Sequence, residues 1–364
     1  MIALPARPRI LVVALRRLGD VLLTTPLIRS LKRAWPDAAI DAMVFRGTEG
    51  ILEGNADIAH VLTLPERASA SESLALLCKL WRAYDLAIST QSGDRPTLLT
   101  WVAGRWSVGF VEASGLMTIV KRAALRHSVR LVGGVNRVPE VLRLAEALGV
   151  AGVAEVVPPQ SRPTQGPDRP YAVIHAAPMF RYKRWTAEGW RELAAALATH
   201  GLEVLATAGP GEAERRYLDD VWNRAPRVQR VDPLPWGELT GLIAGAQLYI
   251  GPDTSVTHLA AAIGTATIAL YGPTDPRLWG PWPAGGLDRP WDGAGTIQNR
   301  GNVWLVQNPP ACPWSILPCQ REGCECRLDS YSRCLDNLAV SQVLSALEAA
   351  LASATAAAAR ASGA

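Results

Sequence analysis

Strand-like apolar runs alternate with helical patterns along this chain of 364 residues, and this alternation restricts its fold more than any other feature. The first half opens with RILVVAL (9–15), DVLLTTPLIRSLKRAW (20–35) and AAIDAMVF (38–45). A continuous apolar run is typical of a strand buried on both faces, and helices between such strands connect a parallel sheet. The order is predicted to continue with a helix at 47–55, a strand at 60–64, a helix at 71–84 and a strand at 85–90. We therefore expect a doubly wound α/β domain with helices on both faces of its sheet.

A proline-rich segment, VVPPQSRPTQGPDRP (156–170), interrupts the alternation and has the composition of a linker. Beyond it, strands are predicted at 171–177, 202–208, 247–251 and 266–272, with helices at 186–201, 211–225, 235–246 and 255–264. This restart predicts a second domain of the same class.

The alternation and the linker together predict the domain boundaries, which are residues 1–165, residues 166–336, an amphipathic helix at 337–354 and a low-complexity tail at 355–364. We expect the tail to be irregular or frayed. Ligands of doubly wound domains bind at the carboxyl ends of the strands, so the loops after the strands are where chemistry is expected.

The charge distribution separates the two halves. The net charge of +4 is too small to indicate a nucleic-acid-binding protein. Residues 1–165 hold 20 Lys/Arg and 14 Asp/Glu, whereas residues 166–364 hold 17 and 19. We therefore expect an anionic partner or a membrane surface at the first domain.

The apolar run near the N-terminus leads directly into a polar loop, and no small-residue cleavage site follows it. This pattern favours a first strand over a secretory signal peptide. No stretch reaches the roughly 18 uninterrupted apolar residues that a membrane-spanning helix needs. We therefore expect a cytoplasmic protein.

The segment LRRLGDVLLTTP (15–26) follows the first strand and opens the first helix. Asp20 stands near the start of this helix, where a carboxylate can cap the helix or serve as a general base. A base at a helix N-terminus would be ionised but weak, so it suits a reaction in which the proton leaves late. The sequence leaves both interpretations of Asp20 open.

Two segments after strands of the second domain carry candidate ligands for a nucleotide. In HAAPMFRYKRWTAEGW (175–190), Lys183 can contact a pyrophosphate as a point charge or lie in a solvated basic loop, and Trp185 is expected to pack. In AGPGEAE (208–214), Glu212 can cap a helix or hold ribose hydroxyls. These glycines fall short of the full dinucleotide-binding pattern, which disfavours a nicotinamide oxidoreductase.

The segment IGPDTSVTHLAAAIGT (250–265) places a carboxylate, hydroxyls and an imidazole where a strand passes into a helix. A helix N-terminus favours an anion through its free amides and its positive dipole end. Thr254 and Ser255 add hydroxyl donors, and His258 lies one turn along, where we expect it to face solvent and donate to a phosphate oxygen. Asp253 is better directed at sugar hydroxyls, because it would repel phosphate. The alternative is a Ser/Thr helix cap beside a core histidine.

Five of the six cysteines lie between Cys312 and Cys334, with the spacing C-x6-C-x4-C-x-C-x7-C. Disulfides are not expected in a cytosolic protein, and the spacing lacks the paired C-x2-C of common zinc sites. We expect a reduced, packed loop without a metal. A structural metal bound by four of these five cysteines is the alternative.

Five segments in order resemble glycosyltransferase family 9, the lipopolysaccharide heptosyltransferases: GDVLLTTP (19–26), KRW (183–185), GPGE (209–212), DTSVTHLAAAIGT (253–265) and ALYGPTDP (269–276). The resemblance extends over nearly the whole chain. It implies a GT-B fold, in which two Rossmann-like domains face each other across an interdomain cleft and the last helix packs back on the first domain.

The resemblance also implies an activity, which is inverting transfer of heptose from ADP-L-glycero-D-manno-heptose to the Kdo/heptose inner core of lipopolysaccharide. No metal or other cofactor is implied. The implied acceptor is a lipid A–Kdo glycolipid, so the enzyme is expected to be peripheral to the inner membrane.

By this resemblance, Asp20 matches the catalytic base. The implied donor-binding residues are Lys183, Glu212, Asp253, Thr254, Ser255 and His258. Ser255 stands where the family commonly has Gly, and HAAPMF replaces a turn of small residues before Lys183. On the basic first domain, we expect acceptor phosphates or carboxylates to meet Arg16, Arg17 and Arg46.

Two alternatives accompany this interpretation. One is a glycosyltransferase of the same fold that uses another sugar nucleotide or another acceptor, including protein. The other is a sugar-nucleotide-binding protein without catalysis, against which the intact Asp20 argues.

Overall fold

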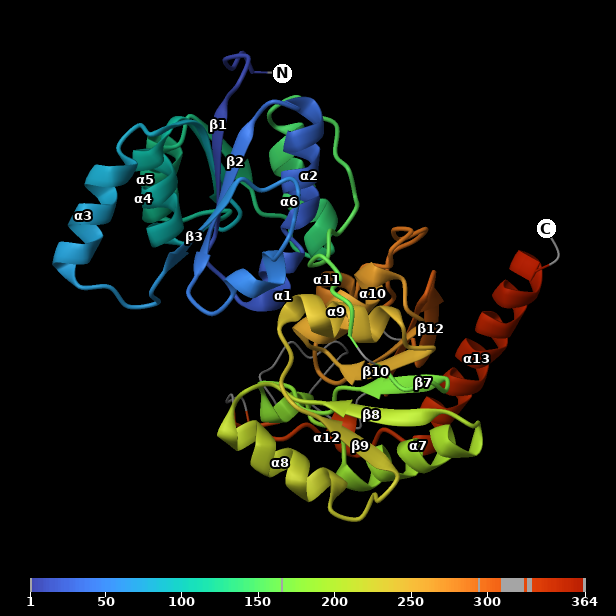
Figure 1. Ribbon diagram of the computed structural model, residues 1–364. Coiled ribbons are helices and arrows are strands. Elements are labelled where there is room, and N and C mark those ends of the chain that lie inside the picture. Colours follow the sequence, from blue (N-terminus) through green and yellow to red (C-terminus); the bar gives the residue numbers. More distant parts are fainter. Residues whose placement is uncertain (1, 165, 294, 309–323, 326–328, 363–364) are drawn as a thin grey trace. The chain divides into compact units, whose positions relative to one another are not determined.

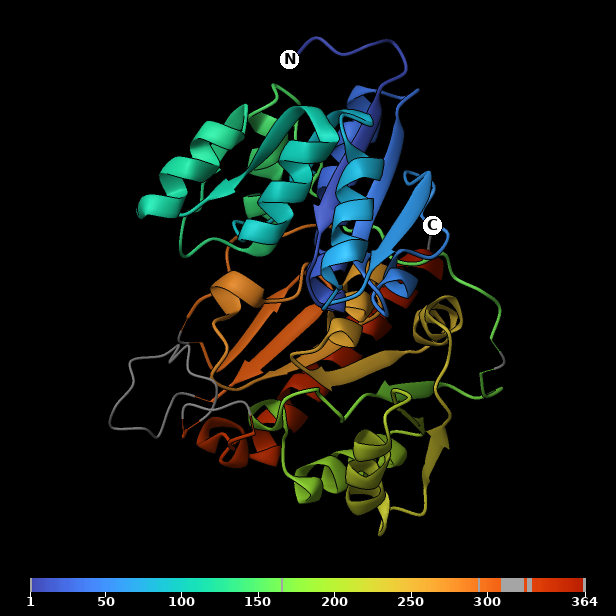
Figure 2. The ribbon, with the colours of Figure 1, turned by 90° about the vertical axis from the view of Figure 1, so that its left-hand side faces the viewer.

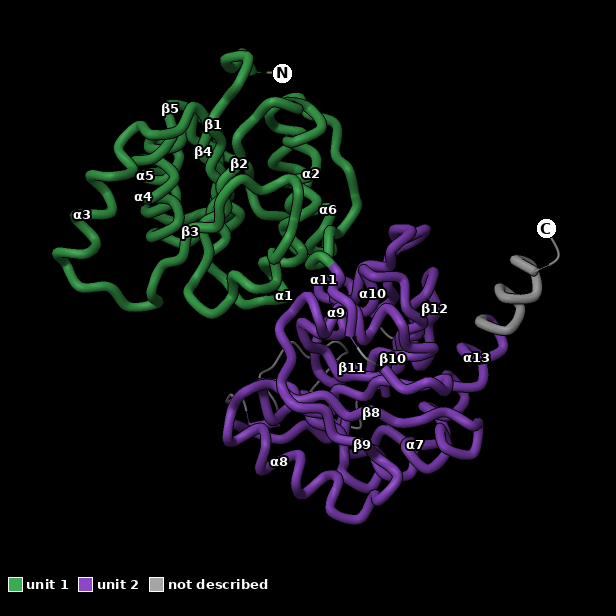
Figure 3. The backbone as a smooth tube through the Cα atoms, viewed as in Figure 1, with its two compact units in different colours: residues 1–160 green, residues 161–364 purple. Residues whose placement is uncertain are grey.

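The computed structural model describes residues 2–164, 166–293, 295–308, 324–325 and 329–362, with side chains described as far as residue 353. Two compact units divide the chain, unit 1 at Met1–Gln160 and unit 2 at Ser161–Ala364 (Figure 3). Each unit has its own sheet with helices on both faces, so the prediction of two α/β domains is confirmed.

Unit 1 is built on six parallel strands in the order β3-β2-β1-β4-β5-β6. The strands are β1 (Arg9–Ala14), β2 (Ala39–Phe45), β3 (His60–Leu64), β4 (Tyr84–Ser89), β5 (Gly104–Val111) and β6 (His127–Arg130). The strand order reverses between β1 and β4, which is the position where sheets of this kind open a crevice for ligands.

The helices of unit 1 form two layers (Figure 1). They are α1 (Leu18–Leu22), α2 (Thr25–Ala34), the 3₁₀ helix η1 (Glu49–Leu52), α3 (Ala70–Leu80), α4 (Asp94–Ala103), α5 (Leu116–Ala124) and α6 (Arg137–Glu146). Helices α3, α4 and α5 cover one face of the sheet, and α2 and α6 cover the other. The core under α3 and α4 joins Leu11 and Val13 of β1 to Leu80 and Leu99.

The single helix predicted at 20–35 is wrong, because the structure has two helices, α1 and α2. Thr24 Oγ1 donates to the Asp20 carbonyl at 2.9 Å, and Thr25 Oγ1 donates to the Leu22 carbonyl at 2.7 Å. Hydroxyls that bond to nearby carbonyls compete with helical hydrogen bonds, and Pro26 has no N–H to continue the ladder. These local bonds explain the break.

Unit 2 is built on seven strands in the order β12-β13-β11-β10-β7-β8-β9, parallel except for β12 against β13. The strands are β7 (Tyr171–Ile174), β8 (Glu203–Thr207), β9 (Val228–Val231), β10 (Leu248–Pro252), β11 (Thr267–Tyr271), β12 (Ile297–Arg300) and β13 (Val303–Gln307). The carboxyl ends of the parallel strands share one edge, so the loops that begin at His175, Ala208, Asp253 and Gly272 open onto that edge.

The helices of unit 2 lie on both faces of its sheet (Figure 1). They are the 3₁₀ helix η2 (Arg181–Lys183), α7 (Ala187–Thr199), α8 (Glu212–Trp222), α9 (Trp236–Ala244), α10 (Ser255–Ile263), α11 (Pro276–Trp279), α12 (Arg333–Asp336) and α13 (Val340–Ser362). The larger core holds Trp190 and Leu193 of α7. Trp185 is buried in the same core and donates through Nε1 to the Leu338 carbonyl at 3.0 Å, so the prediction that it packs is confirmed.

The C-terminal helix α13 belongs to the core of unit 2. Val343, Leu347 and Ala350 are buried with α7 and β13. The prediction that this helix packs on the first domain stays a prediction. Helix α13 also runs to Ser362, beyond the predicted end at 354, because the alanines of the tail have a high helix propensity.

Candidate functional site

The loop between β10 and α10 forms the centre of the candidate site in unit 2. Thr254 is the N-cap of α10, and its side chain accepts a hydrogen bond from the Thr257 amide at 3.3 Å. The capping interpretation of Thr254 is therefore confirmed. Ser255 opens the helix, and this end of α10 carries the unpaired amides and the positive dipole end that favour an anion.

Lys183, at the end of η2, is brought to this loop from 70 residues away in the sequence. Its Nζ donates to Asp253 Oδ2 at 2.5 Å, and the two side chains are only 19% and 7% exposed. Lys183 is therefore not in a solvated basic loop. The pair holds one cation and one anion at the N-terminus of α10.

Asp253 is ionised in this environment. Burial is the strongest influence and raises its pKa, but the charge of Lys183, the charge of His258 and hydrogen bonds from Lys183 and Thr274 together outweigh it. The pKa of Asp253 is therefore lowered. An ionised, buried carboxylate is an acceptor for hydroxyl groups, which fits the predicted role toward a sugar.

His258 is buried, and the prediction that it faces solvent is wrong. The residue is 5% exposed, and its Nε2 lies 3.8 Å from Asp253 Oδ1. Helix α10 is buried on most of its surface, from Val256 through Ala262, so one turn along from Thr254 leads into the protein. The core-histidine alternative is therefore confirmed, and donation from His258 to a phosphate oxygen stays a prediction.

Buried hydroxyl groups hold the loop between β10 and α10 in place. Tyr249 Oη lies 3.0 Å from Thr257 Oγ1, which donates to the Pro252 carbonyl at 2.5 Å. A Cβ on Gly251 would lie 2.3 Å from Tyr249 Oη, so a side chain at this position would displace the tyrosine. Burial and then the negative charge of Asp253 raise the pKa of Tyr271 at the end of β11. These contacts fix the loop that carries Asp253 and Thr254.

Glu212 and Glu214 differ in their surroundings. Glu212 is largely exposed at the start of α8 and pairs with Arg216 at 2.5 Å. Glu214 accepts a hydrogen bond from the Gly209 amide at 2.5 Å, and burial raises its pKa. The sequence pattern pointed to Glu212, but Glu214 is the carboxylate that is held against the glycine-containing loop. Glu214 is the third residue of α8, where a glutamate can reach back to amides that precede the helix, and this position could have indicated it.

His175 is a further residue at this edge that the sequence analysis did not single out. It follows β7 directly, and its Nδ1 lies 3.1 Å from Thr207 Oγ1 at the end of β8. Burial lowers the pKa of His175 to about 4, so the ring is neutral at pH 7. Its position directly after a buried strand could have indicated His175 as a candidate site residue.

Unit 1 presents its candidate residues at the carboxyl edge of its own sheet. Asp20 lies in the first turn of α1, whose N-cap is Arg17, so the interpretation of Asp20 as the N-cap is wrong. Asp20 is half-buried, whereas Arg16, Arg17 and Arg46 are exposed. Their exposure leaves the three guanidinium groups accessible to an anionic ligand.

Gln91 is a second residue that sequence reasoning missed, two positions after the end of β4. It is 7% exposed, and its Nε2 has no hydrogen-bond partner among the described residues. Gln91 lies next to the strand-order reversal between β1 and β4, where ligands of this fold class bind. A buried amide without a partner is unfavourable, so this group is a candidate ligand contact.

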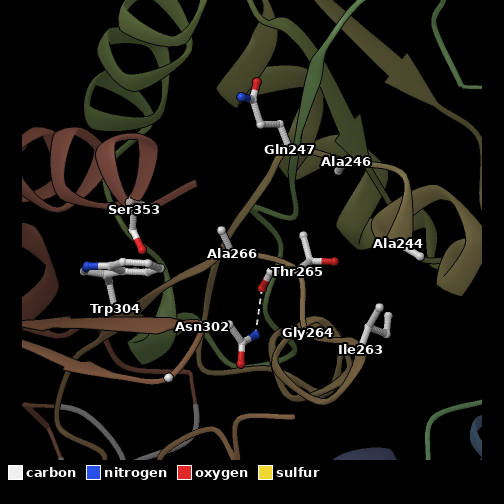
Figure 4. Close-up of a pocket in the computed structure, with 12 residues that line it drawn as sticks. Ala244, Ala246, Gln247, Ile263, Gly264, Thr265, Ala266, Asn302, Trp304 and Ser353 are labelled. Atoms are coloured by element: carbon white, nitrogen blue, oxygen red, sulfur yellow. Dashed lines mark hydrogen bonds between the residues drawn. The ribbon is translucent and has the colours of Figure 1, made fainter. Parts of the chain in front are cut away.

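A cavity of about 640 Å³ lies at the amino ends of the unit 2 strands, opposite the candidate site (Figure 4). Gln247 and Ala266, which directly precede β10 and β11, contribute to its lining. Asn302 also lines it and donates through Nδ2 to the Thr265 carbonyl at 2.8 Å. The described lining contains no charged side chain, and we do not assign the donor to this cavity.

The cysteine-rich segment lies mostly outside the described residues, which include Cys324 and Cys334 but not Cys312, Cys319 or Cys326. The Arg333 amide donates to Cys324 Sγ at 3.3 Å. Within the part of the chain that the structure describes, no three His, Cys, Asp or Glu side chains are grouped so that they could hold a metal. The expectation of a metal-free loop stays a prediction.

The family model of glycosyltransferase family 9 (heptosyltransferase) matches residues 74–285, which is more than half of the chain. The chain belongs to glycosyltransferase family 9. The matched range contains the candidate donor-binding residues of this family 9 enzyme, whereas Asp20 and the three arginines precede it. No helix among the described residues is long and apolar enough to cross a membrane.

Known proteins of the same kind support the family assignment. Lipopolysaccharide heptosyltransferase 3 of Escherichia coli is 31% identical over 284 residues, which cover 72% of this chain and 83% of that protein. The structure of the E. coli ADP-heptose lipopolysaccharide heptosyltransferase II aligns with a TM-score of 0.70 at 17% identity, over 95% of this chain and 99% of that one. The predicted family and the predicted GT-B class of two Rossmann-like domains are confirmed.

A second solved structure also shares the fold. The iron-containing dodecameric glycosyltransferase TibC from enterotoxigenic E. coli H10407 aligns with a TM-score of 0.56 at 17% identity, over 97% of this family 9 chain and 78% of that one. At this identity the similarity shows a common fold alone.

Proposed function

We propose that this family 9 enzyme transfers heptose from ADP-L-glycero-D-manno-heptose to the Kdo/heptose inner core of lipopolysaccharide. The observation that carries the proposal is the buried Lys183–Asp253–His258 cluster at the N-terminus of α10. The name of the 31% identical lipopolysaccharide heptosyltransferase 3 of E. coli supports transfer of heptose to lipopolysaccharide.

Unit 2 binds the donor in this proposal. The pyrophosphate accepts hydrogen bonds from the first amides of α10 and from Ser255 and Lys183, because a helix N-terminus and a lysine both favour an anion. Asp253 stays ionised and accepts hydrogen bonds from sugar hydroxyls. His258 donates to a phosphate oxygen from its buried position, and Glu212 or Glu214 contacts the nucleoside.

Unit 1 supplies the acceptor contacts and the base. The acceptor hydroxyl attacks the anomeric carbon of the heptose as the bond from that carbon to the β-phosphate oxygen breaks. The electron pair of that bond leaves with ADP, and the hydroxyl proton passes to Asp20. Attack from the face opposite ADP inverts the anomeric configuration. The hydroxyl becomes acidic only late in such a reaction, so a weak base is sufficient.

Lys183 and the α10 dipole stabilise the charge that develops on ADP, which is the task of a divalent metal in many other glycosyltransferases. The proposal therefore includes transfer without a metal. The acceptor is a lipid A–Kdo glycolipid, and its anionic groups are matched by Arg16, Arg17 and Arg46. Such an acceptor is in a membrane, so we propose that the enzyme acts at the surface of the inner membrane.

The test is transfer of labelled heptose from ADP-heptose to purified lipid A–Kdo acceptor and, in parallel, to a protein acceptor. Product on the glycolipid supports the proposal. Product on the protein alone would replace lipopolysaccharide by another acceptor. Binding of ADP-heptose without transfer to either would leave a binding protein and would refute the catalytic role of Asp20.

A further inference from the structure

Helix α5 of unit 1 is inverted relative to an ordinary surface helix. Its polar residues Thr118 and Lys121 are 4% and 6% exposed, whereas Leu116 and Ile119 are 78% and 65% exposed. A surface helix normally buries its apolar stripe and exposes its charges. Here the apolar side faces solvent, and we call Leu116, Met117, Ile119 and Val120 the α5 face.

Contacts of the buried lysine fix this orientation. Lys121 Nζ lies 2.9 Å from Asp94 Oδ1 and 3.1 Å from Glu112 Oε1, and it donates to the Ser92 carbonyl at 2.5 Å. Burial is the largest influence on its pKa and lowers it, but the hydrogen bonds and charges of Asp94 and Glu112 raise the pKa overall. A charged lysine held by a carbonyl and two carboxylates prevents the helix from turning its apolar side inward.

Other exposed apolar side chains lie in the same helical layer. Leu98 and Trp101 are exposed on α4, which packs against α5. Trp81, at the end of α3, contacts Trp101 edge-to-face with ring centroids 6.4 Å apart. Figure 2 shows α3, α4 and α5 side by side in front of the strands. None of the exposed large apolar residues described in unit 1 lies on α2 or α6.

Asp94 and Glu112 pair with Lys121, and the other charged side chains on and after α5 are arginines. Residues 98–130 contain five Lys/Arg and one Asp/Glu. Arg122 follows the α5 face and is exposed, and the exposed Arg126 lies over the Trp106 ring, 5.1 Å from its centroid. An apolar helical face flanked by arginines is complementary to the acyl chains and phosphates of an anionic bilayer. The outward side chains from Leu116 to Val120 offer no hydrogen-bonding group to a protein partner, because Thr118 points inward.

We propose that the α5 face docks unit 1 on an anionic lipid bilayer. Its four apolar side chains enter the boundary between headgroups and acyl chains, and Arg122 and Arg126 contact lipid phosphates. The inference rests on the proposed function only for the membrane location, and the α5 face takes no part in the transfer step itself. Docking is measured without donor or acceptor, so a failure of docking and a failure of the proposed function are separate results.

The test is co-sedimentation of the full chain with vesicles of phosphatidylethanolamine and phosphatidylglycerol, compared with phosphatidylcholine vesicles. Leu116→Ser with Ile119→Ser should weaken partition by at least about tenfold, because two inserted side chains are lost. Arg122→Gln should weaken binding to the anionic vesicles by about fivefold and reduce its salt dependence. Ile297→Ser, which removes an exposed isoleucine of unit 2, is the matched control and should bind as the unchanged chain does.

Thermal melts show that the variants fold before partition is compared. Equal binding of the Leu116→Ser/Ile119→Ser variant and the unchanged chain would overturn the proposal. No binding of the unchanged chain to anionic vesicles would also overturn it. If sedimentation velocity then showed a dimer that the double variant loses, the α5 face would be an interface between two copies of the chain.

Discussion

The Lys183–Asp253 pair gives the sharpest test of the donor site, because structural and functional roles can be separated there. Both groups are largely buried and lie 2.5 Å apart. Lys183→Met removes the cation and leaves an ionised Asp253 with His258 and the hydrogen bond from Thr274. Breaking a fully buried pair costs about 3–5 kcal/mol. Lys183 retains partial exposure, so we expect a loss of roughly 2 kcal/mol in unfolding free energy, which corresponds to a Tm decrease of about 4–8 °C.

The double variant Lys183→Met/Asp253→Asn should recover most of this stability, since no buried charge is left without a partner. It should not recover ADP binding. Loss of a charge-assisted contact to phosphate should weaken ADP binding by about tenfold to a hundredfold in both variants. The assays are thermal unfolding and calorimetric titration with ADP and with adenosine, whose binding should change little. Lys79→Met, at an exposed lysine of α3, is the control. If ADP affinity returned together with stability, the reasoning about Lys183 would be refuted.

Four further predictions concern other residues of unit 2. Burial lowers the pKa of His175 from 6.5 to about 4. As the pH falls from 6.5 to about 4, the unfolded chain binds this proton before the folded chain does, so the free energy of unfolding should decrease. A series of thermal melts should show a smaller decrease for His175→Asn. Glu212→Gln should change the unfolding free energy by less than about 0.5 kcal/mol, because its pair with Arg216 is exposed. Comparing adenosine binding in Glu212→Gln and Glu214→Gln identifies the carboxylate that contacts the nucleoside. Metal analysis of the purified chain should find no stoichiometric zinc or iron, whereas one metal per chain that is lost in Cys319→Ser would contradict the metal-free loop.

The alternation of the sequence predicts much of both sheets, because buried parallel strands such as β1 and β10 are continuous apolar runs. It predicts no element between residues 91 and 155, where the structure has α4, β5, α5, β6 and α6. The inverted α5 explains part of this failure. Its apolar residues are exposed and its polar residues are buried, so its sequence lacks the usual pattern of a surface helix. In unit 2, strands β9, β12 and β13 were also not predicted. The short sequence of β12, IQNR, is largely polar.

The candidate site was predictable where residues follow a strand directly, as in the loop that begins at Asp253. Contacts between loops that follow different strands could not be predicted from the sequence. The pair of Lys183 with Asp253 joins loops 70 residues apart. Whether His258 faces solvent depends on how deeply α10 is buried, and helical spacing alone does not reveal this.

The central claim is that this chain is a glycosyltransferase with Asp20 as its base, and Asp20→Asn tests it most directly. The measurement is the rate of heptose transfer from ADP-heptose to lipid A–Kdo acceptor in the presence of EDTA, together with ADP affinity. The unchanged chain should transfer heptose with EDTA present. Asp20→Asn should bind ADP equally well and transfer about 10²–10⁴ times more slowly, the usual contribution of a general base. A decrease of less than about tenfold, or transfer that stops with EDTA, would contradict the account.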